Sequence, residues 1–248
     1  MSNTPKSLQR KIHLISLGCA RNRVDSEVML GALFEKGWVY TQNSKDANAI
    51  VVNTCGFIEA AKEESVDTIL KYAQLKQDNP SLRLIVTGCL TQRYKHQLAK
   101  ALPEVDFFIG TDEFPKIAEI IENDESKGNI FAKRSYYIYN EKLPRINTLT
   151  KHAAYVKIAE GCQHNCAFCI IPAIRGKLRS RPSASIIKEV NSLVKQGIVE
   201  INLIAQDLAA YGRDNKFNDN LISLLKSLCA IEDLKWIRLL YMYPENIN

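Results

Sequence analysis

Short apolar runs alternate with longer amphipathic segments over the first 120 or so residues of the chain. Apolar runs of this length are typical of strands, and we predict strands at residues 11–17, 49–53, 82–87 and 106–110. The segments between them place apolar side chains at helical spacing, which predicts helices at residues 24–36, 57–77, 91–102 and 113–122. This β–α alternation predicts an α/β fold, with a parallel sheet and helices on both faces.

A second β–α series begins at Ala153 and predicts strands at 153–159, 200–205 and 236–241, with helices at 185–196 and 221–230. Three such strands do not close a barrel, so this half predicts a partial (β/α) barrel that is truncated. Residues 123–151 fit neither pattern, and we interpret them as a connection with an edge strand at 135–139. The predicted domains are therefore 10–123 and 152–248, with a linker at 124–151.

The amino-acid composition is that of a soluble, mildly basic protein. Of its 248 residues, 46% are hydrophobic and 24% charged, and the formal net charge is +6. This charge is compatible with a nucleic-acid or ribosome-associated partner without requiring one. No run approaches the roughly 20 apolar residues of a membrane span, and the N-terminus has no secretory apolar region. We therefore expect a cytoplasmic protein without membrane association.

The sharpest motif is Cys162-x3-Cys166-x2-Cys169, which follows a predicted strand. Three thiolates on one loop can hold three irons of a 4Fe–4S cluster and leave the fourth iron open to a substrate or cofactor. The alternatives are a zinc site or uncoordinated thiols. Zinc normally takes four ligands in paired spacing, and His164, the one candidate fourth ligand, lies too close in sequence to reach easily. The cluster is the favoured interpretation.

A second set of three cysteines is dispersed in sequence. Cys19, Cys55 and Cys89 each follow a predicted parallel strand, next to Gly18, Gly56 and Gly88 respectively. The ends of parallel strands converge on one edge of a sheet, where helix N-termini favour an anionic group such as a thiolate-ligated cluster. The alternative is three ordinary buried cysteines. We favour a shared site, and we interpret the seventh cysteine, Cys229, as a core residue of an apolar helix.

Several segments carry a resemblance to a known family. They are SLGC at 16–19, VDSE at 24–27, VNTCGFI at 52–58, TGCL at 87–90, KIAEGC at 157–162, IPAIRG at 171–176, RSR at 179–181 and LIAQD at 203–207. In these segments the chain resembles the methylthiotransferase family of the radical S-adenosylmethionine (SAM) superfamily. The resemblance implies an N-terminal domain with an auxiliary 4Fe–4S cluster on Cys19, Cys55 and Cys89. It also implies a radical SAM domain with a second 4Fe–4S cluster on Cys162, Cys166 and Cys169.

The resemblance further implies a reaction. One SAM methylates sulfur held at the auxiliary cluster, and a second is cleaved to a 5′-deoxyadenosyl radical. That radical takes a hydrogen from the β-carbon of an aspartate in the twelfth small-subunit ribosomal protein, where methylthio is delivered. The implied partners are this ribosomal protein and an electron donor such as flavodoxin, and we expect a monomer.

Two alternative functions stay open. One is the family branch that modifies an adenosine in transfer RNA. The GFIEAA run after Cys55 and the Ala205-Gln206-Asp207 run favour the ribosomal-protein branch. The other is a non-radical iron–sulfur carrier, against which two sets of three cysteines argue, because ferredoxin-type carriers use four per cluster.

Further candidate site residues are less specific. Gln206 and Asp207 end a predicted barrel strand, where radical SAM enzymes commonly bind the SAM amino group, although the usual Gly-Gly-Glu is absent. Arg175, with the other basic residues Lys177, Arg179 and Arg181, either grips SAM or an acidic substrate or forms a solvated loop. The four histidines show no ligand spacing.

The chain is also short for the family. Family members continue with the rest of the barrel and a C-terminal TRAM domain, neither of which is found in this sequence. We therefore expect a fragment that can hold clusters but turns over poorly.

Overall fold

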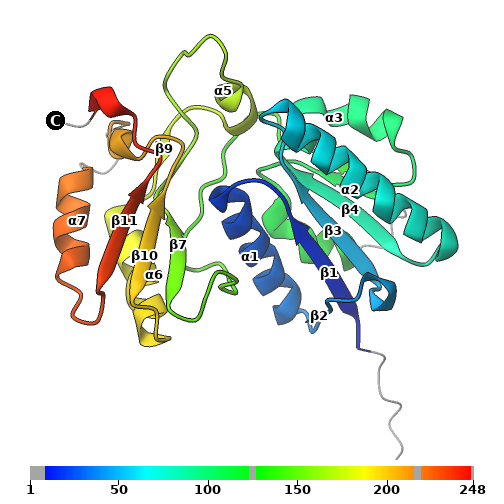
Figure 1. The fold of residues 1–248 in the computed structure, drawn as a ribbon, viewed down its shortest axis with the longest axis horizontal. Coiled ribbons are helices and arrows are strands. Elements are labelled where there is room, and N and C mark those ends of the chain that lie inside the picture. Colours follow the sequence, from blue (N-terminus) through cyan, green and yellow to red (C-terminus); the bar gives the residue numbers. More distant parts are fainter. Residues whose placement is uncertain (1–8, 123–126, 215–218, 247–248) are drawn as a thin grey trace, which may run out of the picture. The chain divides into compact units, whose positions relative to one another are not determined.

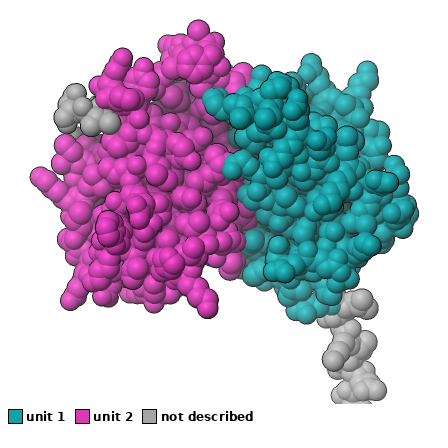
Figure 2. Space-filling model, viewed as in Figure 1, with its two compact units in different colours: residues 1–18, 28–131 teal, residues 19–27, 132–248 magenta. Residues whose placement is uncertain are grey.

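The computed structural model describes residues 9–122, 127–214 and 219–246. The expectations for the N-terminal stretch, and positions 124–126 of the predicted linker, lie outside these ranges. The chain forms two compact units, coloured separately in Figure 2: residues 1–18 with 28–131, and residues 19–27 with 132–248. Helix α1, Ala20–Glu35, crosses the division. In the described ranges, no helix has the length and apolar character needed to cross a membrane.

The first unit is built on a six-stranded sheet whose order is β2-β1-β3-β4-β5-β6, with every neighbouring pair parallel. The strands are β1 Lys11–Ser16, β2 Val39–Tyr40, β3 Ala49–Thr54, β4 Arg83–Gly88, β5 Phe107–Ile109 and β6 Gly128–Ile130. The predicted parallel sheet is confirmed. The sequence pattern missed β2 and β6, because strands of two and three residues are too short to show a period.

Both faces of this sheet are covered, as Figure 1 shows for α2 and α3 on one of them. Ile50 and Val52 of β3 pack with apolar residues of α2, Glu59–Asp78, and α3, Cys89–Ala101. Because side chains alternate along a strand, Val51 points to the other face, and it too is fully buried. Two covered faces explain why β3 is a continuous apolar run rather than an alternating one.

The remaining helices of this unit are α4, Ile117–Glu122, and the short 3-10 turns Ser44–Asp46 and Phe114–Lys116. Helix α3 is interrupted at Lys95, whose backbone has φ 43° and ψ −120°. A positive φ is strained for a residue with a side chain, so α3 consists of two short helical segments that meet at Lys95.

The second unit contains a three-stranded parallel sheet in the order β11-β10-β7. Its strands are β7 Ala153–Lys157, β10 Glu200–Ile204 and β11 Trp236–Leu240. Helices α6, Ser183–Lys195, and α7, Leu221–Cys229, contribute apolar residues to one core with these strands. The partial (β/α) barrel is thereby confirmed. A short antiparallel pair, β8 Ala159–Glu160 with β9 Arg179–Ser180, and helix α5, Ile171–Arg175, complete the unit together with two 3-10 turns.

Two expectations for this unit are wrong. Residues 135–139 do not form a strand. Tyr137 and Tyr139 are buried instead, and the Tyr137 carbonyl accepts hydrogen bonds from the Arg179 guanidinium, so a side chain satisfies the backbone there. Cys229 is exposed rather than in the core. The buried positions of α7 are Leu224 and Leu228, and the next residue turns about 100° away from that face.

Candidate iron–sulfur sites

The loop that carries Cys162, Cys166 and Cys169 lies between β8 and α5, the strand–loop–helix setting that the sequence predicts. Its start is closed by backbone contacts, since the Cys162 amide donates to the Gly176 carbonyl at 3.1 Å. Gly161 makes this possible. It has φ +75°, and a Cβ there would stand 2.1 Å from the Lys177 carbonyl oxygen. Only glycine allows two backbone segments to approach this closely.

All three cysteines of this loop are half-buried, and Cys166 and Cys169 flank a tight turn. The Cys169 amide donates to the Cys166 carbonyl at 3.0 Å, and the His164 amide points to the Cys162 sulfur at 3.5 Å. Burial raises the pKa of the Cys162 thiol, as do the charges of Asp207, Cys169 and Cys166, while the His164 amide opposes them. Neighbouring thiolates therefore repel one another unless a positively charged group such as iron lies between them.

Within the described ranges, no three His, Cys, Asp or Glu side chains converge in the way that binds a single metal ion. A single ion gathers all its ligands around one centre. In a 4Fe–4S cluster each cysteine binds a different iron, so the sulfurs stand farther apart. The cluster on Cys162, Cys166 and Cys169 therefore stays a prediction, based on three thiolate donors of the kind that ligate iron.

His164 has a partner that sequence reasoning missed. Its Nε2 lies 2.7 Å from Asp207 Oδ2, and its ring packs against Tyr243 with the centroids 4.5 Å apart. Asp207 Oδ1 accepts hydrogen bonds from the amides of Ala209 and Tyr243, both at 3.1 Å. Asp207 thus ties the cysteine loop to the ends of β10 and β11. His164 and Asp207 lie 43 residues apart, and no local spacing reveals such a pair.

A buried ionic group lies behind the cysteine loop. Lys157 Nζ is 2.5 Å from both Asp25 Oδ1 and Glu160 Oε1, and Arg175 Nη1 is 2.9 Å from Asp25 Oδ2. Each of these four side chains is at most 4% exposed. Two cations balance two carboxylates, which removes the large cost of burying a lone charge.

Gln206 joins this group by one end of its amide. Its Nε2 donates to Glu160 Oε2 at 2.9 Å. Its Oε1 is buried and has no hydrogen-bond partner among the described residues. A buried acceptor without a donor is unusual in a folded protein and indicates a missing ligand group.

The basic run near α5 is not a solvated loop throughout. Arg175 and Arg181 are buried and paired, Arg175 as above and Arg181 with Glu189 at 2.5 Å. Arg179 donates to the carbonyls of Arg175 and Lys177. Three of the four cations therefore support the protein's own framework, and a contact from Arg175 to SAM stays a prediction.

In the first unit, the turns after β3 and β4 lie against each other. Thr54 of β3 is the register partner of Gly88 of β4, so Cys55 and Cys89 follow neighbouring strand ends. A Cβ on Gly56 would stand 2.7 Å from Leu90 Cα. Gly88 has φ +97°, and a Cβ there would stand 2.4 Å from the Thr54 oxygen. The two glycines allow the cysteine-bearing turns to approach.

Cys19 follows β1, whose last residue, Ser16, is the register partner of Asn53 in β3. Cys19 itself is the first residue of the segment 19–27 assigned to the second unit. Burial raises the pKa of its thiol, but Arg21, the amides of Asn22 and Arg21, and Arg175 outweigh that effect and lower it overall. A thiolate is the form that ligates iron. The shared site of Cys19, Cys55 and Cys89 stays a prediction.

Comparison with known proteins places these features in context. Residues 11–110 match the model of the family described as "Uncharacterized protein family UPF0004". The chain is 50% identical over 242 residues to "Ribosomal protein uS12 methylthiotransferase RimO" of Citrifermentans bemidjiense, covering 97% of the chain and 54% of that protein. It is 49% identical over 243 residues to the protein of the same name from Myxococcus xanthus, covering 98% of the chain and 50% of that protein. The chain thus spans about half the length of the relatives it matches.

Solved structures show the same fold at low sequence identity. One is the radical S-adenosylmethionine methyltransferase TsrM from Kitasatospora setae with tryptophan and a SAM analogue, at a TM-score of 0.51 and 14% identity. The matched region covers 88% of this chain and 50% of the TsrM chain. TsrM with cobalamin and a [4Fe–4S] cluster gives a TM-score of 0.52 at 13% identity, covering 89% of this chain and 52% of that one. The resemblance expected from the motifs is confirmed by these relatives, and over nearly its whole length the chain is similar in sequence to proteins named RimO.

Proposed function

We propose that this chain is the cluster-bearing part of a radical SAM methylthiotransferase that modifies an aspartate of the twelfth small-subunit ribosomal protein, uS12. The relatives that support the proposal bear the name of that activity and are about 50% identical to this chain. The structural observation that supports it best is the buried, unpartnered Gln206 Oε1 in the unit that holds the cysteine loop. The alternative, modification of adenosine in transfer RNA, lacks a comparable observation.

The cysteines suit two 4Fe–4S clusters in their donor chemistry. Cys162, Cys166 and Cys169 would hold the radical SAM cluster, and Cys19, Cys55 and Cys89 the auxiliary one. When bound, the first cluster supplies the electron that cleaves SAM, and the second holds the sulfur to be transferred. The protein's part is to position and shield these groups. Asp207 contributes to this through its contact with His164 of the cysteine loop.

SAM has an ammonium group that can only donate hydrogen bonds. Glu160 accepts from the nitrogen end of the Gln206 amide, which fixes the amide orientation and leaves Oε1 as an acceptor. We assign Gln206 Oε1 to the SAM ammonium. Arg175 and Asp207 then act as positioning residues, since Arg175 holds Asp25 and Glu160 in place and Asp207 holds the loop.

A Gln206→Leu variant tests this assignment. It keeps the side-chain volume but removes the acceptor, and a hydrogen bond to a charged group contributes about 1.5–3 kcal/mol. We therefore expect SAM to bind about tenfold more weakly or worse, measured by calorimetry on the anaerobically reconstituted chain. Gln196→Leu, at the exposed end of α6, is the matched control and should bind SAM as the unchanged chain does. Equal SAM affinity in Gln206→Leu, with normal iron content, would refute the assignment.

A second measurement on the same reconstituted chain identifies the substrate that receives the methylthio group. The reconstituted chain receives SAM and a chemical reductant together with either the small-subunit ribosomal protein or transfer RNA. Because the chain spans about half of its relatives, we expect only a small fraction of the substrate to be modified. Mass spectrometry should find that small amount of methylthio on an aspartate of the protein and none on the RNA. Methylthio on an adenosine instead would support the transfer RNA branch.

A further inference from the structure

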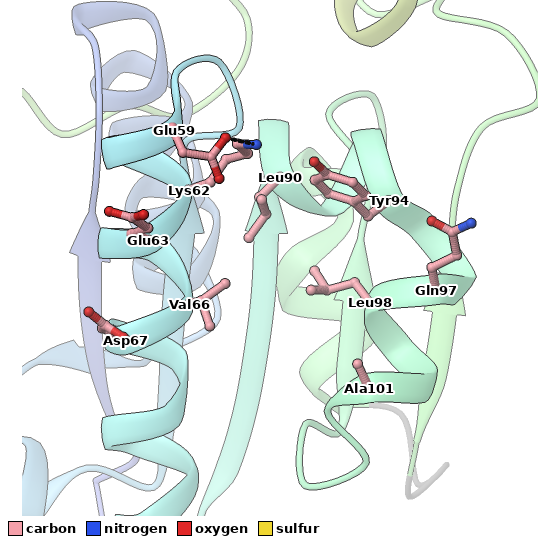
Figure 3. Close-up of a pocket in the computed structure, with 10 residues that line it drawn as sticks. All are labelled: Glu59, Lys62, Glu63, Val66, Asp67, Leu90, Tyr94, Gln97, Leu98 and Ala101. Carbon is pink, nitrogen blue, oxygen red and sulfur yellow. Dashed lines mark ion pairs between the residues drawn. The ribbon is translucent and has the colours of Figure 1, made fainter.

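A groove runs between α2 and α3 of the first unit (Figure 3). Its volume is about 560 Å³, within the range of ligand sites in proteins. No cysteine lines it, although Leu90 at one end of the groove directly follows Cys89. Its lining residues are Glu59, Lys62, Glu63, Val66, Asp67, Leu90, Tyr94, Gln97, Leu98 and Ala101.

The floor of the groove is apolar. Val66 of α2 faces Leu90 and Leu98 of α3 across it, and Ala101 continues the floor at the end of α3, as Figure 3 shows. Leu90 is buried, whereas Val66 and Leu98 are only partly covered and Ala101 is exposed. Part of this apolar surface is therefore in contact with water, and covering it releases free energy in proportion to its area.

The α2 rim of the groove is acidic. Glu59, Glu63 and Asp67 recur every four residues and so form one line along the helix. Glu59 is ion-paired with Lys62. Glu63 and Asp67 are exposed, and among the described residues neither has an ion-pair partner. The opposite wall is formed by the uncharged side chains of Tyr94 and Gln97, and Arg93, which lies 5.3 Å from the centre of the Tyr94 ring, donates to the Gly56 carbonyl. This rim is thus a negative line on a chain whose formal net charge is +6.

We propose that this groove binds a basic amphipathic helix of a partner protein. The apolar side of such a helix would cover Val66, Leu90 and Leu98, in the helix-in-groove mode of recognition. Lysines or arginines four residues apart on the partner would be spaced about 6 Å along its axis. That spacing matches Glu63 and Asp67, which are also four residues apart on a helix. The two unpaired carboxylates disfavour nucleic acid and anionic membranes as occupants.

The proposal does not rest on the proposed function, because no cysteine lines the groove and the test measures peptide binding and not SAM chemistry. The probe is a fluorescein-labelled 18-residue peptide with leucines on one helical face and lysines on the other. Two companion peptides replace the lysines by glutamates or the leucines by serines. Binding to the anaerobically reconstituted chain is followed by fluorescence anisotropy, and circular dichroism verifies that each variant is folded.

Glu63→Gln/Asp67→Gln should weaken binding of the lysine–leucine peptide roughly tenfold, since each exposed ion pair contributes up to about 1 kcal/mol. The matched control is Glu232→Gln/Asp233→Gln, which removes two exposed carboxylates of the second unit and should leave binding unchanged. Both companion peptides should bind more weakly than the parent peptide. Equal losses in both double variants, or equal binding of the serine peptide, would overturn the proposal. Dimerisation of the chain that Glu63→Gln/Asp67→Gln abolishes would overturn it in favour of a second copy as the occupant.

Discussion

Replacing Arg145 with methionine is expected to lower the free energy of unfolding by about 3–5 kcal/mol, because it leaves a buried carboxylate without its cation. Arg145 lies in the second unit and is 6% exposed. Its guanidinium reaches Glu27 at 2.6 Å and Glu189 at 2.6 Å, and it donates to the Tyr155 carbonyl at 2.6 Å. Burial by itself lowers the pKa of Arg145. The negative charges of Glu189 and Glu27 outweigh burial and raise this pKa overall, so the group stays charged.

In the Arg145→Met variant, the two carboxylates keep different hydrogen-bond and ion-pair partners. Glu189 keeps Arg181, which lies 2.5 Å away. Among the described residues, the donors that Glu27 keeps are neutral: the amide and hydroxyl of Thr148, at 2.7 and 2.8 Å. Glu27 is 0% exposed, so water cannot replace the lost cation. Most of the expected destabilisation therefore comes from Glu27.

Arg238→Met is the control for this prediction. Arg238 pairs with Glu200 at 2.8 Å, but its side chain is 54% exposed, so water replaces the lost pair and the free energy of unfolding should change far less than in Arg145→Met. Unfolding in urea, followed by circular dichroism, gives both values under one condition. If both variants lose a similar amount of unfolding free energy, burial of the Arg145 ion pairs does not determine how much they stabilise the fold.

Gly161→Ala is expected to lower the free energy of unfolding by about 3–5 kcal/mol and to prevent iron incorporation at the adjacent cysteine loop. The added Cβ would stand 2.1 Å from the Lys177 oxygen and 2.6 Å from the Gly176 oxygen, both on backbone that cannot move alone. Moving that backbone breaks the Cys162–Gly176 hydrogen bond that closes the loop. Iron bound per chain after reconstitution is the second measurement, beside denaturant unfolding.

Gly197→Ala separates backbone strain from the close contact. Gly197 lies in the same unit and has φ +92°, but nothing stands within 4 Å of a Cβ placed there. It should cost only the strain of a positive φ, about 1–2 kcal/mol, and leave iron binding unchanged. Equal effects in the two variants would show that the approach of residues 161 and 177 is unimportant for the loop.

The sequence pattern predicts those parts of the fold that rest on local periodicity. β3 and β4 are six-residue strands built around short apolar runs that are buried on both faces, and they appear where the pattern predicts them, to within one residue. β2 and β9, with two residues each, are set by pairing with a distant strand and leave no local signal. Cys229 was misplaced for a related reason. Apolar residues flank it on both sides in the sequence, and only the packing of α7 decides which side of the helix is buried.

The candidate site likewise has some features that the sequence reveals and others that only the structure reveals. The spacing of Cys162, Cys166 and Cys169 is local, so the sequence alone indicates a cluster loop. The partners of that loop are not local: Arg175 meets Asp25 across 150 residues of chain. The unpartnered oxygen of Gln206 is likewise visible only in three dimensions, because it depends on what fails to reach it.

The central claim is that the chain holds two separate clusters, and an iron count tests it most directly. The chain is reconstituted anaerobically beside a Cys162→Ala/Cys166→Ala/Cys169→Ala variant, and iron and sulfide are measured per chain. The account predicts about eight irons in the unchanged chain and about four in the variant, one 4Fe–4S cluster having been lost. About four irons in the unchanged chain and none in the variant would contradict it, and Cys19, Cys55 and Cys89 would then be structural.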